Sequence, residues 1–271
     1  MRLIGVILSF NEEVHLSRCL SHWGQVLDAV YLVDSLSTDS TLQIAQQYNL
    51  KIFQREFDSY SDQFNWSLSQ IDATEKDWII KIDCDEISDQ YLIRNLKSFL
   101  ETLPYSTTGV TVNRSIYFQQ KPIRHGGLFP QKNLRIFRYG YGLAENKMMD
   151  EHIQTTGNTI HFPGQIHDIC LKDIDFWLYK HILYAKRKAQ DINSNQTSLS
   201  PQSKLTLKSA LEIYIYNKLP AFWLGPLIYF LYRYVVRLGF LDGANGFMYH
   251  FLHAFWYRLL INYYASQTKN I

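Results

Sequence analysis

The sequence predicts an α/β protein built on a mostly parallel sheet with helices on both faces. In the first hundred residues, short continuous apolar runs alternate with segments of helical periodicity, the pattern of doubly buried strands joined by helices. The chain has 271 residues, 46% of them hydrophobic, which suffices for a full core. Polar residues, several of them acidic, follow the apolar runs, at the sheet edge where such proteins bind ligands.

Four apolar runs are the predicted strands of the first half: residues 3–9, 29–33, 51–54 and 77–82. Helices are expected between them, over residues 12–23, from the capping residues 37–39 through residue 48, and over 61–71. After residue 108 a β-rich half is expected, with strands at 109–113 and 135–138 around a Gly-, Pro- and Arg-rich loop at 124–130. A helix over 177–191 and a polar linker at 191–203 follow.

Composition excludes several classes of protein. The formal net charge is only +2, which disfavours nucleic acid as a partner. The three cysteines are widely spaced, so neither a disulfide framework nor a Cys-rich zinc site is expected. The apolar run at the N-terminus is too short, and followed too soon by acidic residues, for a signal peptide. We therefore expect a cytosolic protein.

The last quarter of the chain is apolar and aromatic but interrupted. Pro226 can begin a helix and Gly239 can end it, and a second run covers residues 247–265. Four polar residues of that run share half of the helical wheel: His250, His253, Arg258 and Asn262. Cations outnumber acids over residues 204–271, so we expect amphipathic helices that associate with a membrane surface. The alternative is a helix pair packed on the catalytic domain or in an oligomer contact.

Two carboxylates one residue apart, Asp83 and Asp85, close the fourth predicted strand, and Glu86 follows them. Such oxygen ligands suit Mg²⁺ or Mn²⁺, which would neutralise charge on a diphosphate leaving group. Acids on a solvated strand end are the alternative interpretation. Asp34 ends the second strand, beside Ser9 of the first, and its carboxylate could accept from a base N–H or a ribose hydroxyl. No Gly-rich phosphate loop is present.

If a diphosphate leaves while its group is transferred to an acceptor hydroxyl, a base must take the proton of that hydroxyl. Two adjacent acids, Asp150 and Glu151, precede His152 and could provide this base. Solvated acids in a turn are the alternative. His161 and His167 could be core residues or metal ligands.

These segments together resemble the family 2 glycosyltransferases, which have the GT-A fold. The matching stretches are residues 6–13, 33–41 and 77–86, with residues 63–68 similar to the helix beside the nucleotide. Later segments resemble a subgroup related to lipopolysaccharide-core, capsule and exopolysaccharide transferases: residues 124–127, 135–138, 150–153, 180–185, 238–243 and 254–258. The family usually has Gly where Leu36 stands, and often Ala where Cys84 stands.

The resemblance implies a role for each site residue. Six residues would bind the nucleotide-sugar donor: Ser9, Asn11, Glu12, Asp34, Gln63 and Asn65. Asp83 would bind ribose or the water shell of the metal, Asp85 the metal itself, and Glu151 or Asp150 would be the base. His125, Gly126 and Arg135 would belong to the acceptor side.

The predicted organisation is a catalytic domain over residues 1–190, with a donor half at 1–100 and an acceptor half at 101–190, followed by the linker and the helical region. The resemblance implies inverting transfer of a hexose or N-acetylhexosamine, from a UDP-sugar to a glycan or glycolipid, on the cytoplasmic face of the inner membrane. Three alternatives are a polyprenyl-phosphate glycosyltransferase, a non-catalytic nucleotide-sugar-binding or scaffold protein, and a nucleotidyltransferase.

Overall fold

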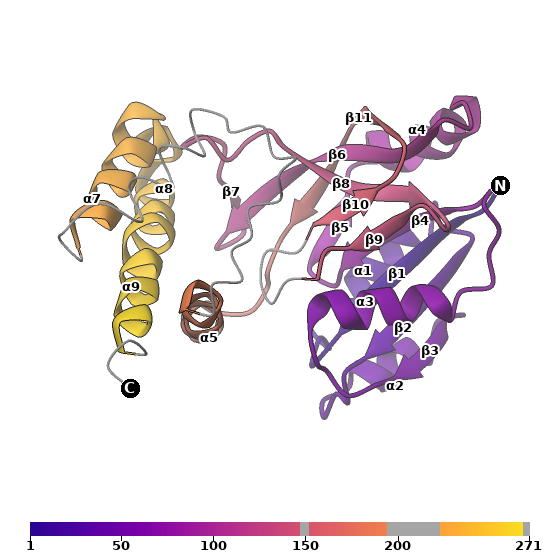
Figure 1. The fold of residues 1–271 in the computed structure, drawn as a ribbon, viewed down its shortest axis with the longest axis horizontal. Coiled ribbons are helices and arrows are strands. Elements are labelled where there is room, and N and C mark those ends of the chain that lie inside the picture. Colours follow the sequence, from indigo (N-terminus) through magenta and orange to yellow (C-terminus); the bar gives the residue numbers. More distant parts are fainter. Residues whose placement is uncertain (147–151, 194–222, 268–271) are drawn as a thin grey trace. The chain divides into compact units, whose positions relative to one another are not determined.

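The computed structural model describes residues 1–146, 152–193 and 223–267 (Figure 1). These residues form two compact units. Unit 1 comprises Met1–Pro122 and Phe129–Leu171, and unit 2 comprises Ile123–Leu128 together with the chain from Lys172 onward. The boundary predicted at residue 190 lies inside a helix of unit 2.

Unit 1 is built on one mixed sheet, whose strand order is β3-β2-β1-β4-β8-β6-β11-β5. Its strands are β1 (Leu3–Ser9), β2 (Ala29–Asp34), β3 (Lys51–Gln54), β4 (Trp78–Asp83), β5 (Glu86–Ser88), β6 (Thr107–Phe118), β8 (Gln131–Arg138) and β11 (Asn158–Asp168), with β7 (Lys121–Pro122) paired to β6. The half β3-β2-β1-β4 is parallel, and β8 is antiparallel to both β4 and β6. A separate antiparallel pair consists of β9 (Gly142–Ala144) and β10 (Ile153–Thr155).

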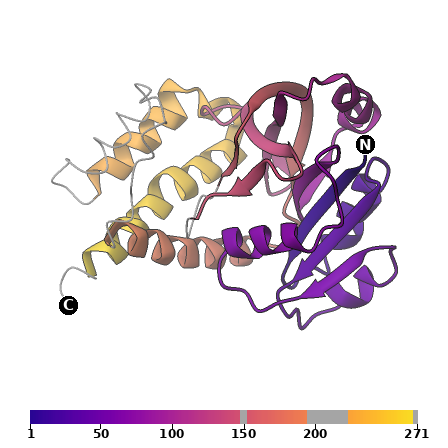
Figure 2. The same ribbon diagram turned by 45° about the vertical axis from the view of Figure 1, so that its right-hand side comes forward.

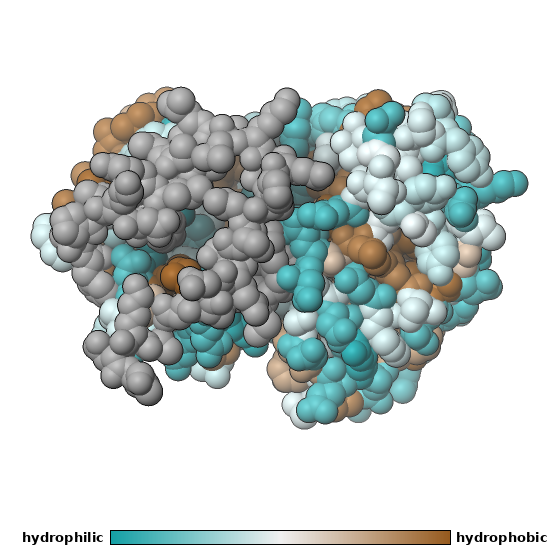
Figure 3. Space-filling view, viewed as in Figure 1, coloured by the Kyte–Doolittle hydropathy of each residue, from teal (hydrophilic) through white to brown (hydrophobic). Residues whose placement is uncertain are grey.

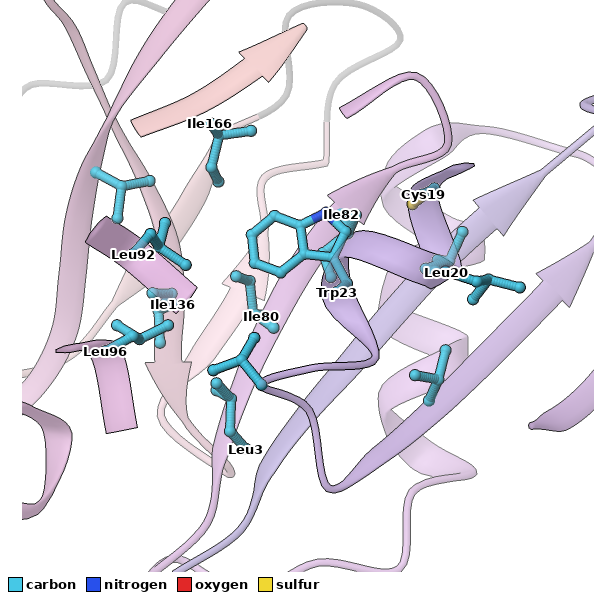
Figure 4. Packing of buried hydrophobic residues seen from close by; sticks show 14 of the residues in the cluster. Leu3, Cys19, Leu20, Trp23, Ile80, Ile82, Leu92, Leu96, Ile136 and Ile166 are labelled. Atoms are coloured by element: carbon cyan, nitrogen blue, oxygen red, sulfur yellow. The ribbon is translucent and has the colours of Figure 1, made fainter. Parts of the chain in front are cut away.

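Helices cover both faces of the sheet, as predicted. On one face lie α1 (Leu16–Trp23), α2 (Thr41–Ala45) and α4 (Gln90–Thr102), and on the other lies α3 (Tyr60–Ser69). Figure 4 shows the first layer, where Trp23 of α1 lies among Ile80 and Ile82 of β4 and Leu92 of α4. All four side chains are fully buried. Burying a large apolar side chain contributes about 1.5–3 kcal/mol, so this layer holds β4 firmly in place.

Several predicted boundaries differ from the structure. The first helix begins at Leu16 rather than residue 12, and the backbone N–H groups of Asn11 and Glu12 donate to side chains of another loop. The second helix ends at Ala45, short of residue 48. Strand β6 extends well past the predicted 109–113, and β11 was not predicted at all, because its pairing with β6 joins residues some fifty positions apart.

Unit 2 is helical. It contains α5 (Ile174–Asn193), α7 (Leu224–Leu231), η1 (Tyr232–Val236), η2 (Gly239–Asp242), α8 (Gly243–His250), η3 (Phe251–Trp256) and α9 (Tyr257–Gln267). Helix α5 packs against α9 and crosses it (Figure 2). Of the described helices, none alone is long and apolar enough to cross a membrane, although the pair Leu224–Val236 and Gly239–Gln267, bent by 73°, meets the length and composition test together.

Candidate functional site

The parallel strands end side by side and bring predicted site residues together. Ser9 and Asp34 are register partners on β1 and β2, and Leu8 is opposite Asp83 of β4. The fully buried Asp34 carboxylate accepts from the Ser9 hydroxyl at 3.0 Å, from the Ser37 hydroxyl at 2.5 Å and from the Ser37 N–H at 2.8 Å. These donors hold the carboxylate in one orientation at the carboxyl edge of the sheet.

The loops after β1 and β2 interlock through their own polar groups. Asn11 N–H donates to the Ser37 hydroxyl, and the Asn11 side-chain oxygen accepts from Thr38 N–H, both at 2.8 Å. Glu12 N–H donates to the Thr41 hydroxyl at 2.7 Å. Because two loops from different strands share these bonds, Asn11 and Glu12 are fixed beside Asp34, and their binding of the donor stays a prediction.

Leu36 occupies a left-handed backbone conformation, with φ of 62°, and its side chain is about half exposed. This region is unfavourable for a residue with a Cβ and favours glycine. The glycine that the family usually carries here therefore has a structural reason, and this chain keeps the turn with a strained leucine.

Asp83 ends β4 in contact with a buried arginine. Nη2 of Arg135 on β8 lies 3.2 Å from Oδ2 of Asp83 and also donates to Oε1 of Glu86. Glu86 is fully buried, and its other oxygen accepts from the Asp83 N–H at 3.1 Å. Arg114 of β6 lies between Glu86 and Asp168 of β11. Two cations and three carboxylates thus form one network behind the strand end.

This network shifts the titration of its members. Burial raises the pKa of the Glu86 carboxyl to about 8, and the negative charge of Asp83 adds to the rise while Arg135 opposes it. Burial would also raise the pKa of Asp83, but the positive charges of Arg135, Lys81 and Arg114 hold it well below its usual range. Asp83 is therefore the ionised carboxylate at the edge, and Glu86 lies behind it.

Asp85, the second carboxylate of the pair, is held through its backbone. Its carbonyl oxygen accepts from Ile169 N–H at 2.9 Å and from Arg18 Nη2 at 3.3 Å, and the same guanidinium donates to the carbonyl of Ile169 at 2.5 Å. His15 adds a second link, because its Nδ1 bonds Glu12 at 2.5 Å and its Nε2 accepts from Leu171 N–H at 2.8 Å. The loops at the strand ends are therefore tied to the end of β11.

The donor set at this edge fits a divalent cation held by few protein ligands. Asp83 and Asp85 are both partly exposed oxygen ligands, and Mg²⁺ commonly takes one or two carboxylates and completes its shell with water and substrate phosphates. Within residues 1–146, 152–193 and 223–267, no three His, Cys, Asp or Glu side chains converge as in a preformed metal site. His167 is consequently not joined to the two aspartates, and its ring packs edge-on against Tyr117.

The two predicted donor residues of α3 differ in role. Gln63 is fully buried and its amide N–H donates to the Ser35 hydroxyl at 3.2 Å, so it supports the loop beside Asp34. Both ends of the Asn65 amide bond the backbone of Ala144, at 3.0 and 2.8 Å. Asn65 thus clamps β9 to α3, a structural role, and its contact with the donor stays a prediction.

The residues predicted for the acceptor side belong to different units. Arg135 belongs to unit 1 and bonds Asp83, whereas His125 and Gly126 belong to unit 2. His125 Nδ1 lies 2.7 Å from Asp242. The predicted bases, Asp150 and Glu151, lie outside the described residues.

Four further residues of this network were not singled out by sequence: His15, Arg18, Arg114 and Asp168. Each of the four contacts a partner more than fifty positions away in the sequence, so no local pattern marks these contacts. His15 also bonds Glu12, three positions before it. The helical spacing of His15 and Glu12 was the one available signal.

The chain was compared with known proteins. The sequence model described as glycosyl transferase family 2 matches residues 6–162, more than half of the chain. An uncharacterised glycosyltransferase of Rickettsia typhi is 25% identical over 264 residues, covering 92% of this chain and 82% of that protein. An uncharacterised glycosyltransferase of Rickettsia felis is 32% identical over 85 residues, which cover 31% of this chain and only 29% of the relative.

Two solved structures are also similar. Residues 1–349 of S. aureus TarS, in complex with UDP-GlcNAc, align with a TM-score of 0.47 and 14% identity, covering 100% of this chain and 92% of that one. Glucosyl-3-phosphoglycerate synthase from Mycobacterium tuberculosis, in complex with Mn²⁺, UDP and glucosyl-3-phosphoglycerate, aligns with a TM-score of 0.34 and 22% identity over 42% of this chain and 44% of that one. On the extent of the sequence-model match, this chain belongs to glycosyl transferase family 2.

Proposed function

We propose that this protein transfers a hexose or N-acetylhexosamine from a UDP-sugar to a glycan or glycolipid acceptor of the bacterial envelope, with inversion at the transferred carbon. The observation that carries the proposal is the convergence of Asp34, Asp83 and Asp85 at one sheet edge in a family 2 chain. Asp34 would accept hydrogen bonds from the nucleoside, and the interlocked loops of Asn11 and Glu12 form its surroundings.

A divalent cation, Mn²⁺ or Mg²⁺, would be held by Asp85 with Asp83 and would supply positive charge to the diphosphate leaving group. Asp83 suits this site because its pKa lies below the usual range, which keeps the carboxylate ionised. Arg135 restrains Asp83 from behind, and the Arg18 contact restrains the Asp85 backbone. Glu151 or Asp150 would take the proton from the acceptor hydroxyl.

The decisive experiment is calorimetric titration of the full chain with a panel of nucleotide sugars, once with Mn²⁺ and once with chelator. Manganese-dependent binding of one UDP-sugar is the expected result, and it should be lost in Asp85→Asn. Asp89→Asn is the matched control, because that aspartate caps α4 away from the strand end. Equal affinity with chelator would overturn the metal assignment, and no binding by any nucleotide sugar would favour a scaffold protein.

The base is tested separately by kinetics. Glu151→Gln should keep the affinity for the donor and lose transfer, because the change removes a proton acceptor and leaves the donor site intact. Asp150→Asn is the companion variant. If Glu151→Gln transfers normally and Asp150→Asn does not, the base is Asp150.

We further propose that unit 2 docks on the cytoplasmic face of the inner membrane. Its helices are apolar outside, with eleven large hydrophobic side chains exposed between residues 223 and 251: Trp223, Ile228, Leu231, Val235, Val236, Leu238, Phe240, Leu241, Phe247, Met248 and Phe251. Figure 3 shows brown, hydrophobic atoms at the end of the view where Figure 1 has α7 and α8. On the same elements the side chains of Arg233 and His250 are buried, whereas Arg237 is exposed. So large an apolar exterior suits contact with hydrocarbon rather than with water.

Flotation with vesicles of phosphatidylethanolamine and phosphatidylglycerol tests this docking. The pair Val235→Asp and Val236→Asp should release the protein from vesicles, because it places two charges on the most exposed part of that surface. Leu143→Asp is the matched control, an equally exposed leucine on β9 of unit 1. If the Val235/Val236 variant still floats like the wild type, the helices pack against protein instead.

A further inference from the structure

The interior of unit 2 holds cationic and imidazole groups with spare hydrogen-bonding capacity. Arg233 is 7% exposed and His250 is 0% exposed. Arg233 Nε donates to the carbonyl of Gly126 at 2.8 Å, and Nη1 to the Tyr229 hydroxyl at 3.1 Å. In the part of the chain that the structure describes, Nη2 of Arg233 and both ring nitrogens of His250 have no hydrogen-bond partner.

No carboxylate neutralises Arg233 among the described residues. Asp242, the acid of η2, is already engaged by the loop of residues 123–128. Its Oδ2 accepts from the N–H groups of Arg124 and His125, at 3.1 and 2.9 Å, and its Oδ1 faces His125 Nδ1. Among the described residues, the charge of the buried guanidinium is therefore not compensated by an acid, and its Nη2 has no hydrogen-bond partner.

Shape, rather than hydrogen bonding, holds the His250 ring in place. Gly126 and Gly239 lie against it so closely that an added Cβ would come within 2.1 Å and 2.6 Å of ring atoms. Gly126 also has φ of 72°, which favours glycine. An apolar side chain could fill such a space equally well, so packing alone does not explain an imidazole here.

Leaving these groups unsatisfied is costly. A buried charge without a partner costs several kcal/mol, and each unsatisfied donor or acceptor about 1–3 kcal/mol. Native proteins leave few such groups, and a bound ligand is a common reason for them. A site that has positive charge, several hydrogen-bond donors and no available acid favours an oxyanion as its ligand. A planar guanidinium beside an imidazole suits the oxygens of a phosphate group.

The surroundings of Arg233 and His250 indicate which class of phosphate compound they bind. The same helices that bury Arg233 and His250 expose Val235, Phe247 and Phe251 on their outer side. A phosphate attached to a hydrocarbon chain could place its head group inside and its chain along this apolar exterior. We propose that Arg233 and His250 bind the phosphate of a lipid phosphate ester, the membrane-borne acceptor. This inference rests on the proposed sugar transfer at a membrane.

The test uses the full chain in a neutral detergent, titrated calorimetrically with decyl phosphate, decanol and inorganic phosphate. Wild type should bind decyl phosphate. Arg233→Gln and His250→Gln should each weaken this binding at least about tenfold, because the first removes the positive charge and the second removes the imidazole N–H donor from its position. Arg237→Gln is the matched control, an exposed arginine one helical turn away, and should change affinity less than about twofold.

Each contrary outcome has a distinct meaning. Equal binding of decanol, or equal loss in the Arg237 control, would overturn the site in favour of hydrophobic or surface-charge attraction. Inorganic phosphate binding as tightly as decyl phosphate would keep the anion site and overturn the lipid source. If Arg233→Gln does not fold, Arg233→Lys and His250→Gln carry the test. UDP titration of the same sample separates the two proposals: UDP binding without decyl phosphate binding refutes only this one.

Discussion

Replacing Arg135 by methionine should destabilise the protein to an extent that depends on pH. Arg135 is the largest positive influence on Glu86, which is fully buried and already has its pKa raised to about 8. Without the guanidinium, that pKa rises further. A carboxyl with a raised folded-state pKa is stabilising when protonated, and its contribution is lost as pH rises through that value.

The expected size follows from the contacts that are lost. At pH 6 Glu86 is protonated, so Arg135→Met removes mainly the bonds to Asp83 and Glu86, costing about 1–2 kcal/mol. At pH 9 the variant must either bury an unpaired carboxylate or take up a proton against the solution. The cost should then reach about 3–5 kcal/mol, the range for breaking a buried ion pair. Glu86→Gln should remove this dependence on pH.

Urea unfolding of wild type, both single variants and the double variant at pH 6, 7.5 and 9 measures the effect. The double variant should be more stable at pH 9 than Arg135→Met alone, because it leaves no buried charge without a partner. The double-mutant cycle formed by these four proteins cancels the effects of other titrating groups on the free energy of unfolding. The reasoning is refuted if the cost of Arg135→Met is the same at all three pH values, or if the two changes add within about 0.5 kcal/mol at pH 9.

Three further predictions concern the donor edge and the start of the sheet. Leu36→Gly should raise the free energy of unfolding by up to about 1 kcal/mol, because glycine relieves the positive φ, whereas Leu36→Ala should give no such gain in the same urea titration. Asp34→Asn should weaken UDP binding at least about tenfold and cost about 1–3 kcal/mol, since an amide cannot satisfy all three donors; unchanged calorimetry would exclude Asp34 from the donor site. Burial would raise the pKa of Asp77, but bonds from Arg2 and Thr74 lower it to about 2. The stabilisation from Asp77 is therefore present above about pH 4 and lost towards pH 2. Between these pH values, the free energy of unfolding of Asp77→Asn should fall by about 1–2 kcal/mol less than that of the wild type. This range is reduced because Arg2 is half-exposed.

The parallel half of the sheet could be predicted because its signals are local. A doubly buried strand is a continuous apolar run, and β1 to β4 were placed within a residue or so on that basis. Parallel strands share one carboxyl edge, so the convergence of Asp34 and Asp83 follows from strand order. Sequence marked Leu36 as a departure from the family's glycine, but only the structure showed that the left-handed turn is kept there.

The remainder depended on pairing between distant parts of the chain. Strand β11 is half polar and has no strand signal of its own, but it joins β6 and brings Asp168 to Arg114. The pairing of β8 with β4 placed Arg135 on Asp83, although sequence had assigned Arg135 to the acceptor side. Likewise, only the tertiary structure showed that Gly126 packs against His250 in unit 2. Sequence by itself determined the chemistry available at the strand ends, because hydrophobic periodicity and strand-end polarity are local. The tertiary structure decided which charges meet, because that depends on contacts no local pattern encodes.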